Sequence, residues 1–380
     1  MNSVTHKPRI YRFAVAAFFF IAGISFASWA SRIPDISRAL NLHEGALGAV
    51  LFALPIGSMC SLPLSGWLVA KLGSRKVATI SGLIYPTILI CLGFSNTVPL
   101  LTITLFFFGL FGNMMNISVN TQAVGVEAMY NRSIMATFHG VWSLAGFTGA
   151  AVGTILISQG FDPYQHFIGI ASVMICMALF SQKYILPYDQ YHPDQPIFAK
   201  PDANLLKLGL IAFCCMAAEG TMFDWSGIYF QKVVQAPKNL TTLGYAAFMS
   251  TMAGGRFLGD RLVTRFGRKN ILLGSGSVIA TGLLTAVIFP SLVTATAGFL
   301  LVGIGVSSVV PVVYSEAGKS TTMSAGVALA AVSSIGFLGF LIGPPLIGFI
   351  AEWLGLQWSF ALIALLGFGT TLLARITKFS

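Results

Sequence analysis

Long apolar stretches, separated by short polar ones, recur along the whole 380-residue chain. A helix needs about 20 mostly apolar residues to cross the hydrocarbon core of a bilayer, and each stretch is about that long. The expected spans are residues 11–31, 46–68, 78–95, 99–125, 134–157, 165–186, 205–230, 242–262, 270–289, 292–316, 324–350 and 356–376. The pattern therefore predicts an all-α membrane protein with twelve transmembrane helices.

Prolines fall inside several of these spans, at Pro55, Pro86, Pro311, Pro344 and Pro345. Neighbouring helices can accommodate such kinks within a membrane, so the span assignments stand. The longest polar stretch, from Pro187 to Ala203, lies between the sixth and seventh spans.

The composition excludes a soluble protein. Hydrophobic residues make up 56% of the chain and charged residues 9%, whereas a soluble domain carries about 25% charged residues. The formal net charge of +10 does not indicate nucleic-acid binding, because basic residues that flank membrane spans record topology instead.

The Lys and Arg residues predict the orientation of the chain. With the N-terminus in the cytoplasm, 18 of the 22 basic residues lie in cytoplasmic segments. The outside keeps only Arg32, Arg38, Lys232 and Lys238. The positive-inside rule then predicts that both termini are cytoplasmic.

Glycine and phenylalanine patterns repeat at about half the chain length. Gly146-Phe147-Thr148-Gly149 in span five recurs as Gly336-Phe337-Leu338-Gly339 in span eleven, and Gly73 after span two matches Gly267 after span eight. Coincidence is the alternative, but the matches fall in equivalent spans. We expect an N-terminal six-helix bundle (1–186), a cytoplasmic linker (187–203) and a C-terminal six-helix bundle (204–380).

The loop after span two carries a family resemblance. Residues 66–76 resemble the G-x-L-x-D-R-x-G-R-K loop of the major facilitator superfamily, with Ala70 where the family usually has Asp. Residues 261–269 form a second, more basic copy. Six plus six helices is also the plan of that superfamily.

Shorter pieces point to one branch of that superfamily. The Gly-Arg-Phe-x-Gly sequence at residues 255–259 is similar to the fucose-permease branch, and residues 27–32, 139–144, 219–225 and 343–348 resemble MosC-like inner-membrane proteins. The resemblance implies an inner-membrane secondary transporter, expected to be monomeric, that moves a sugar, polyol or amino-sugar-like solute by alternating access.

Two acids lie clearly within predicted spans. Glu219 and Asp224 both fall in span seven, with Glu219 nearer the midplane. A carboxyl there can be neutralised by a proton and so couple transport to the proton gradient. The alternative is a structural acid held by hydrogen bonds between helices.

Span four predicts a polar helix face. Asn113, Asn116 and Asn120 follow i, i+3, i+7 spacing and so share one side. Amides both donate and accept, which suits a polyhydroxyl ligand, although they also serve as packing contacts between helices. His139 in span five is expected either to bind ligand or relay protons, or to be a hydrogen-bonded structural residue.

Aromatic residues complete the expected substrate site. Trp29, Trp142 and Trp225 suit stacking on a sugar or, alternatively, an interfacial belt, and Tyr314 shares a face of span ten with Ser307 and Pro311. Four charged residues are expected at the gates: Arg32, Arg75, Arg256 and Asp260. Arg32 is placed at the outer end of span one, where an interface anchor is the alternative role.

Other functional classes lack their motifs. No nucleotide-binding G-x-x-x-x-G-K-[ST] loop, hydrolase motif or Cys/His metal cluster occurs in the sequence, so we expect no enzyme, cofactor or metal. The expected partners are a small-molecule substrate, the lipid bilayer and protons. The alternatives are a proton-driven multidrug or metabolite exporter and, from another class, a non-transporting membrane receptor.

Overall fold

The computed structural model describes residues 8–130, 134–187, 201–320 and 325–379, and all regular secondary structure within them is helical. This confirms the all-α prediction. The α-helices are α1 (Pro8–Ala39), α2 (Glu44–Leu51), α3 (Ala53–Leu72), α4 (Ser74–Gly93), α5 (Val98–Glu127), α6 (Met135–Ser158), α7 (Pro163–Ser181), α8 (Ala203–Lys232), α9 (Leu243–Phe266), α10 (Arg268–Ile288), α11 (Leu292–Ser307), α12 (Val309–Ala317), α13 (Ala325–Leu354) and α14 (Leu356–Ile376). Two short 3-10 helices, η1 (Gln182–Tyr184) and η2 (Lys238–Leu240), follow α7 and α8.

Eleven spans of the described chain are long and apolar enough to cross a membrane. The remaining long helix, α9, has 24 residues but is less apolar because it carries Arg256, Arg261 and Arg265. With α9 as the eighth span, these helices are the twelve that the hydrophobic pattern predicts.

Two predicted spans are interrupted, each three residues before a proline. The helix breaks between α2 and α3 at Phe52, ahead of Pro55, and between α11 and α12 at Ser308, ahead of Pro311. Proline lacks the N–H that would bond four residues back, and its ring crowds that carbonyl. The sequence places Pro55 and Pro311 inside spans two and ten, and both spans still cross the membrane as Glu44–Val69 and Leu292–Ala317.

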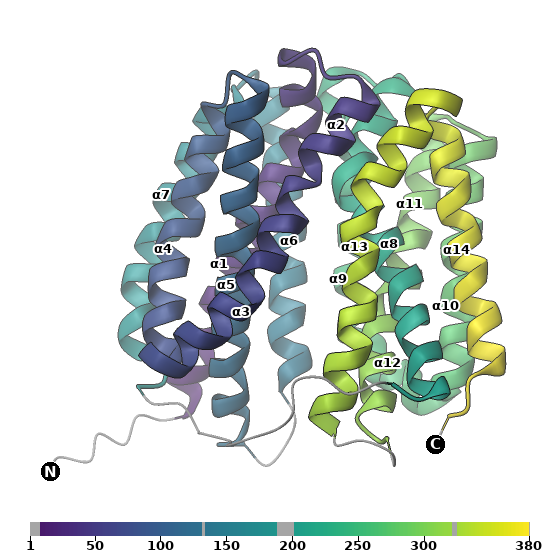
Figure 1. Ribbon diagram of the computed structural model, residues 1–380. Helices are drawn as coiled ribbons and strands as arrows, with labels where there is room; N and C mark the ends of the chain where they lie inside the picture. The colour runs from purple at the N-terminus through teal and green to yellow at the C-terminus, as the bar shows by residue number, and fades with distance from the viewer. Residues whose placement is uncertain (1–7, 131–133, 188–200, 321–324, 380) are drawn as a thin grey trace, which may run out of the picture. The chain divides into compact units, whose positions relative to one another are not determined.

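The chain forms two compact units, and the helices of both are labelled in Figure 1. Unit 1 holds Met1–Leu40 and Ala53–His192, and unit 2 holds Asn41–Phe52 and Pro193–Ser380. The short helix α2 therefore belongs to unit 2, where Lys232 contacts Glu44 at 2.9 Å. The domain boundaries expected at residues 186 and 204 stay a prediction.

Glycines bring corresponding helices together inside each unit. A Cβ on Gly149 of α6 would lie 2.8 Å from the Ala27 Cβ of α1, and one on Gly339 of α13 would lie 2.5 Å from the Phe213 carbonyl oxygen of α8. Side chains at these positions would force the helices apart, as expected where membrane helices pack through small residues. The repeated glycine pattern thus places the same contact in both units.

Candidate functional site

A buried ion pair lies in the middle of two helices of unit 2. The Nη2 group of Arg256 donates a hydrogen bond to Oε1 of Glu219 over 3.1 Å. This bond joins α9 to α8. The two side chains are only 14% and 6% exposed. A charge inside the membrane is costly without a partner, so each residue neutralises the other.

Arg256 lies inside the eighth span, as expected. It contacts the carboxylate predicted to bind protons, a pairing that the sequence did not indicate. Asp260, the other gate residue predicted on this helix, has a side chain outside the described residues. The roles assigned to both residues remain predictions.

Asp224 and Trp225 follow Glu219 on α8. Asp224 is half-buried and has no ion-pair partner among the described residues, so it differs from Glu219. Trp225 is fully buried, and its indole N–H has no hydrogen-bond partner in the described part of the chain. Tyr314 lies in α12, half-buried.

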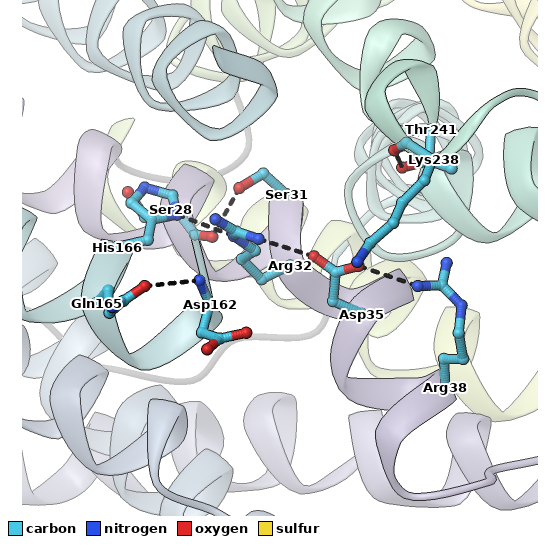
Figure 2. Close-up of polar contacts among 10 residues, drawn as sticks. All are labelled: Ser28, Ser31, Arg32, Asp35, Arg38, Asp162, Gln165, His166, Lys238 and Thr241. Carbon is cyan, nitrogen blue, oxygen red and sulfur yellow. Dashed lines mark hydrogen bonds and ion pairs between the residues drawn. The ribbon is translucent and has the colours of Figure 1, made fainter. Parts of the chain in front are cut away.

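Unit 1 contains a second buried charged cluster, which Figure 2 shows. Arg32 of α1 donates through Nη1 to Asp35 over 2.8 Å and through Nε to the His166 Nδ1 over 3.2 Å. Asp35 also pairs with Arg38, one turn further along the same helix, at 3.2 Å. Because Nδ1 of His166 accepts this hydrogen bond, the imidazole is neutral and carries its proton on Nε2.

The start of α7 fixes the position of His166. Asp162 is the N-cap, its backbone N–H donates to the Gln165 side chain over 3.0 Å (Figure 2), and Pro163 occupies the first turn. This capping box begins the helix at Pro163, three residues before His166, so His166 lies in the first turn of α7.

Arg32 corrects the expectation that it ends a span at the outer surface. It is 1% exposed, because α1 continues seven residues further, to Ala39. One of its terminal nitrogens and Nε2 of His166 have no hydrogen-bond partner among the described residues. The Ser28 hydroxyl and the Trp29 indole N–H, on neighbouring positions of α1, are also buried and unpaired there.

The three asparagines of α5 have different surroundings. Asn113 is buried and donates to the Ser58 carbonyl of α3 over 2.9 Å, so it contacts a neighbouring helix. Asn116 is exposed and accepts a hydrogen bond from Asn120 over 2.8 Å. Of the predicted polar face, Asn116 and Asn120 are the part available to a ligand.

The other predicted site residues of unit 1 lie on α1, α6 and α4. His139 is exposed, and its ring meets the Phe19 ring edge-on with the ring centroids 5.5 Å apart. Trp142 is half-buried beside Phe26. Trp29 is 1% exposed, which removes it from the interfacial belt that was the alternative. Arg75, at the start of α4, donates to the main-chain carbonyls of Gln182 and Lys183.

Sequence reasoning missed three polar residues, of which His166 and Glu316 are buried and Asp35 is half-buried. Asp35 lay outside the predicted first span, whose end was set too early, although an acid three residues after Arg32 was a visible signal of an i, i+3 pair. His166 sits alone in an apolar run and gave no spacing signal. Glu316, which lies 3.6 Å from Arg268 in unit 2, was placed at a span end and not weighed.

The sequence is similar to a known family and to several proteins within it. Residues 13–325 match the family described as the Major Facilitator Superfamily. An uncharacterised MFS-type transporter of Yersinia pestis is 36% identical over 348 residues, covering 92% of this chain and 91% of that protein. The membrane protein MosC of Rhizobium meliloti is 31% identical over 359 residues, covering 93% and 87%.

Solved structures share the fold at low sequence identity. A bacterial homologue of the human lysosomal transporter Spinster, in an inward-facing and occupied conformation, superposes with a TM-score of 0.76 at 16% identity, covering 97% of each chain. The nucleoside transporter NupG gives a TM-score of 0.73 at 14% identity, covering 97% of this chain and 99% of its own. At such identities the likeness concerns the fold alone.

Proposed function

Because the chain belongs to the major facilitator superfamily, we propose that it is a secondary transporter that moves a small polar solute by alternating access, coupled to protons. Membership makes it a multi-pass membrane transporter with a small-molecule substrate. The solute class, the coupling ion, the monomeric state and the orientation are our proposals.

The Glu219–Arg256 ion pair carries the proposal. A proton added to the Glu219 carboxylate gives a neutral acid and removes the anionic charge that Arg256 contacts at 3.1 Å in a buried site. Breaking a buried pair on one side is strongly unfavourable, so proton binding must be accompanied by movement of Arg256, hydration or a new anionic or acceptor group. In our proposal Arg256 moves. Proton binding to Glu219 is then linked to a rearrangement of α8 and α9, which is what coupled transport requires.

A polar solute suits the amide and imidazole groups of α5 and α6. Asn116 and Asn120 present an amide pair on α5 with His139 exposed on α6. Amides and imidazole supply donors and acceptors to hydroxyl groups. We therefore propose sugars, polyols or amino sugars as the substrate class, and sugar symport as the form of transport.

The proposed location is the inner membrane with both termini in the cytoplasm. The distribution of Lys and Arg supports it, since 18 of 22 basic residues lie on one side of the predicted spans.

The substrate class is tested on the purified full-length protein by thermal unfolding in detergent against monosaccharides, inositols, hexitols, amino sugars and hydrophobic drugs. A ligand that binds only the folded state raises the unfolding temperature by mass action. We expect at least one polyhydroxyl compound to do so. Stabilisation by hydrophobic drugs alone would favour the exporter instead.

Variants then locate the contact. Asn116→Ala and Asn120→Ala should weaken the stabilisation by the bound solute while leaving the unfolding temperature without solute unchanged. Thr102→Val on the same helix is the matched control, because its exposed hydroxyl bonds only to the Val98 carbonyl of its own helix. Wild-type binding by both Asn variants would contradict the proposed site.

A further inference from the structure

Unit 1 contains a cavity of about 460 Å³ where α3 ends and α4 begins. Its lining includes Leu72, Arg75, Lys76, Ile80, Gln182 and Pro187. None of these six residues has a part in the proposed transport site beyond the gate role predicted for Arg75.

The cavity lies at the membrane–water boundary. Three apolar spans end or begin beside it: Glu44–Val69, Ser74–Gly93 and Pro163–Tyr184. Trp67 and Tyr184 are exposed close to these ends, as aromatic residues at headgroup depth characteristically are. The cavity therefore sits where phospholipid headgroups lie.

The charge around the cavity is positive, and neither of its cations has an acidic partner among the residues that the structure describes. Arg75 bonds only to main-chain carbonyls, at 3.1 and 3.4 Å, and Lys76 is exposed and unpaired in the described structure. No Asp or Glu occurs anywhere from Ala53 to Val126. The next acid, Glu127, has its carboxylate occupied by the backbone N–H groups of Ile134 and Met135.

The repeated sequence in unit 2 offers a direct comparison. Gly73 and Gly267 precede α4 and α10 with the same backbone conformation, φ of 83° and 77°, and the first cation follows two residues after Gly73 and one residue after Gly267. In unit 2, however, Arg268 lies 3.6 Å from the buried carboxylate of Glu316. The first cation of α10 thus has an acidic partner, whereas Arg75, the first cation of α4, contacts no acid among the residues that the structure describes.

We propose that the cavity beside Arg75 and Lys76 binds the phosphate of an anionic phospholipid headgroup. The two cations would contact the phosphate oxygens, and the exposed Leu72 and Ile80 would contact the glycerol and upper acyl chains. Basic pockets between membrane helices are suited to such headgroups. The proposal requires neither a substrate nor proton coupling, so its failure is independent of the proposed function.

Native mass spectrometry of the purified full-length protein tests this site. Phosphatidylglycerol and phosphatidylcholine are added at equal concentrations, and the bound fractions are compared. We expect the wild type to prefer phosphatidylglycerol and Lys76→Gln to lower that preference about five-fold, the value of one cation near an anionic lipid surface. Lys76 is exposed, so the variant should fold normally. Lys269→Gln, the exposed cation beside the neutralised Arg268, should change the preference little.

A second measurement separates a lipid from a free anion. Inorganic phosphate is titrated into delipidated protein while thermal unfolding is followed. The proposal predicts stabilisation by short-chain phosphatidylglycerol that depends on Lys76 and exceeds that by phosphate. Two results would overturn the proposal. One is an equal loss of the phosphatidylglycerol preference in Lys76→Gln and Lys269→Gln. The other is stabilisation by phosphate that depends on Lys76 without any lipid preference.

Discussion

The guanidinium of Arg256 lies 3.1 Å from the carboxylate of Glu219, and this contact joins the middle of α9 to the middle of α8. In lipid, such a pair replaces two isolated charges with one neutral unit. It explains how an acid and a base can both be buried in apolar helices. It also means that a proton arriving at Glu219 neutralises the carboxylate that faces the Arg256 cation.

The pair predicts non-additive effects on stability. Arg256→Gln and Glu219→Gln should each lower the free energy of unfolding by about 3 kcal/mol, because each breaks a buried ion pair from one side. The double variant should lose much less than the sum. Thermal unfolding of the four proteins measures this cycle, and purely additive losses would show that the two side chains do not interact.

The glycine contacts between helices predict a steric effect. Gly339→Ala should destabilise unit 2 by about 1–3 kcal/mol, because its Cβ would press against the α8 backbone. Gly343→Ala on the same helix is the control, since a Cβ there meets no atom within 4 Å. Detergent unfolding should separate the two variants, and equal behaviour would remove close approach as the reason for the glycines.

His166 predicts a requirement for a hydrogen-bond acceptor. His166→Leu removes the partner of the Arg32 Nε and should cost about 1–3 kcal/mol of stability, the penalty for a buried polar group left unpaired. His166→Asn, whose amide oxygen can replace Nδ1, should recover part of that loss. His43→Asn tests an exposed histidine in the same assay and should change little. Equal losses in the Leu and Asn variants of His166 would argue for packing alone.

The hydrophobic pattern was sufficient for the helices but not for their internal breaks. The length of a membrane span follows from the thickness of the bilayer. The eleven apolar spans and α9 could therefore be predicted from the sequence. The breaks at Phe52 and Ser308 depend on where a proline removes a backbone bond, and the ends of α1 depend on packing that buries Arg32. Sequence periodicity contains neither kind of information.

The site was predictable only one residue at a time. Glu219 stood out because acids are rare in lipid, but its partner Arg256 is 37 positions away on another helix. His166 and Arg32, 134 positions apart, likewise meet only through helix packing. Pairings of this kind depend on tertiary contacts between distant positions, which one sequence by itself does not reveal.

The basic residues predict the topology. A reporter enzyme or fluorescent protein fused at Asp194 or after Lys378 should report a cytoplasmic location, because the cytoplasmic segments hold 18 of the 22 Lys and Arg residues. A fusion at Asn41 should report the opposite side. A periplasmic signal at Asp194 would contradict the two-bundle arrangement.

Uptake by Glu219→Gln in liposomes, with and without an imposed proton gradient, tests the central claim most directly. The substrate is the compound identified by thermal stabilisation, and Glu316→Gln serves as the matched variant of a buried, arginine-paired acid at a helix end. The account predicts that Glu219→Gln loses gradient-driven accumulation but still exchanges substrate, Asp224→Asn shows a partial loss, and Glu316→Gln keeps its gradient dependence. Accumulation by Glu219→Gln at the wild-type rate would contradict proton coupling through this residue.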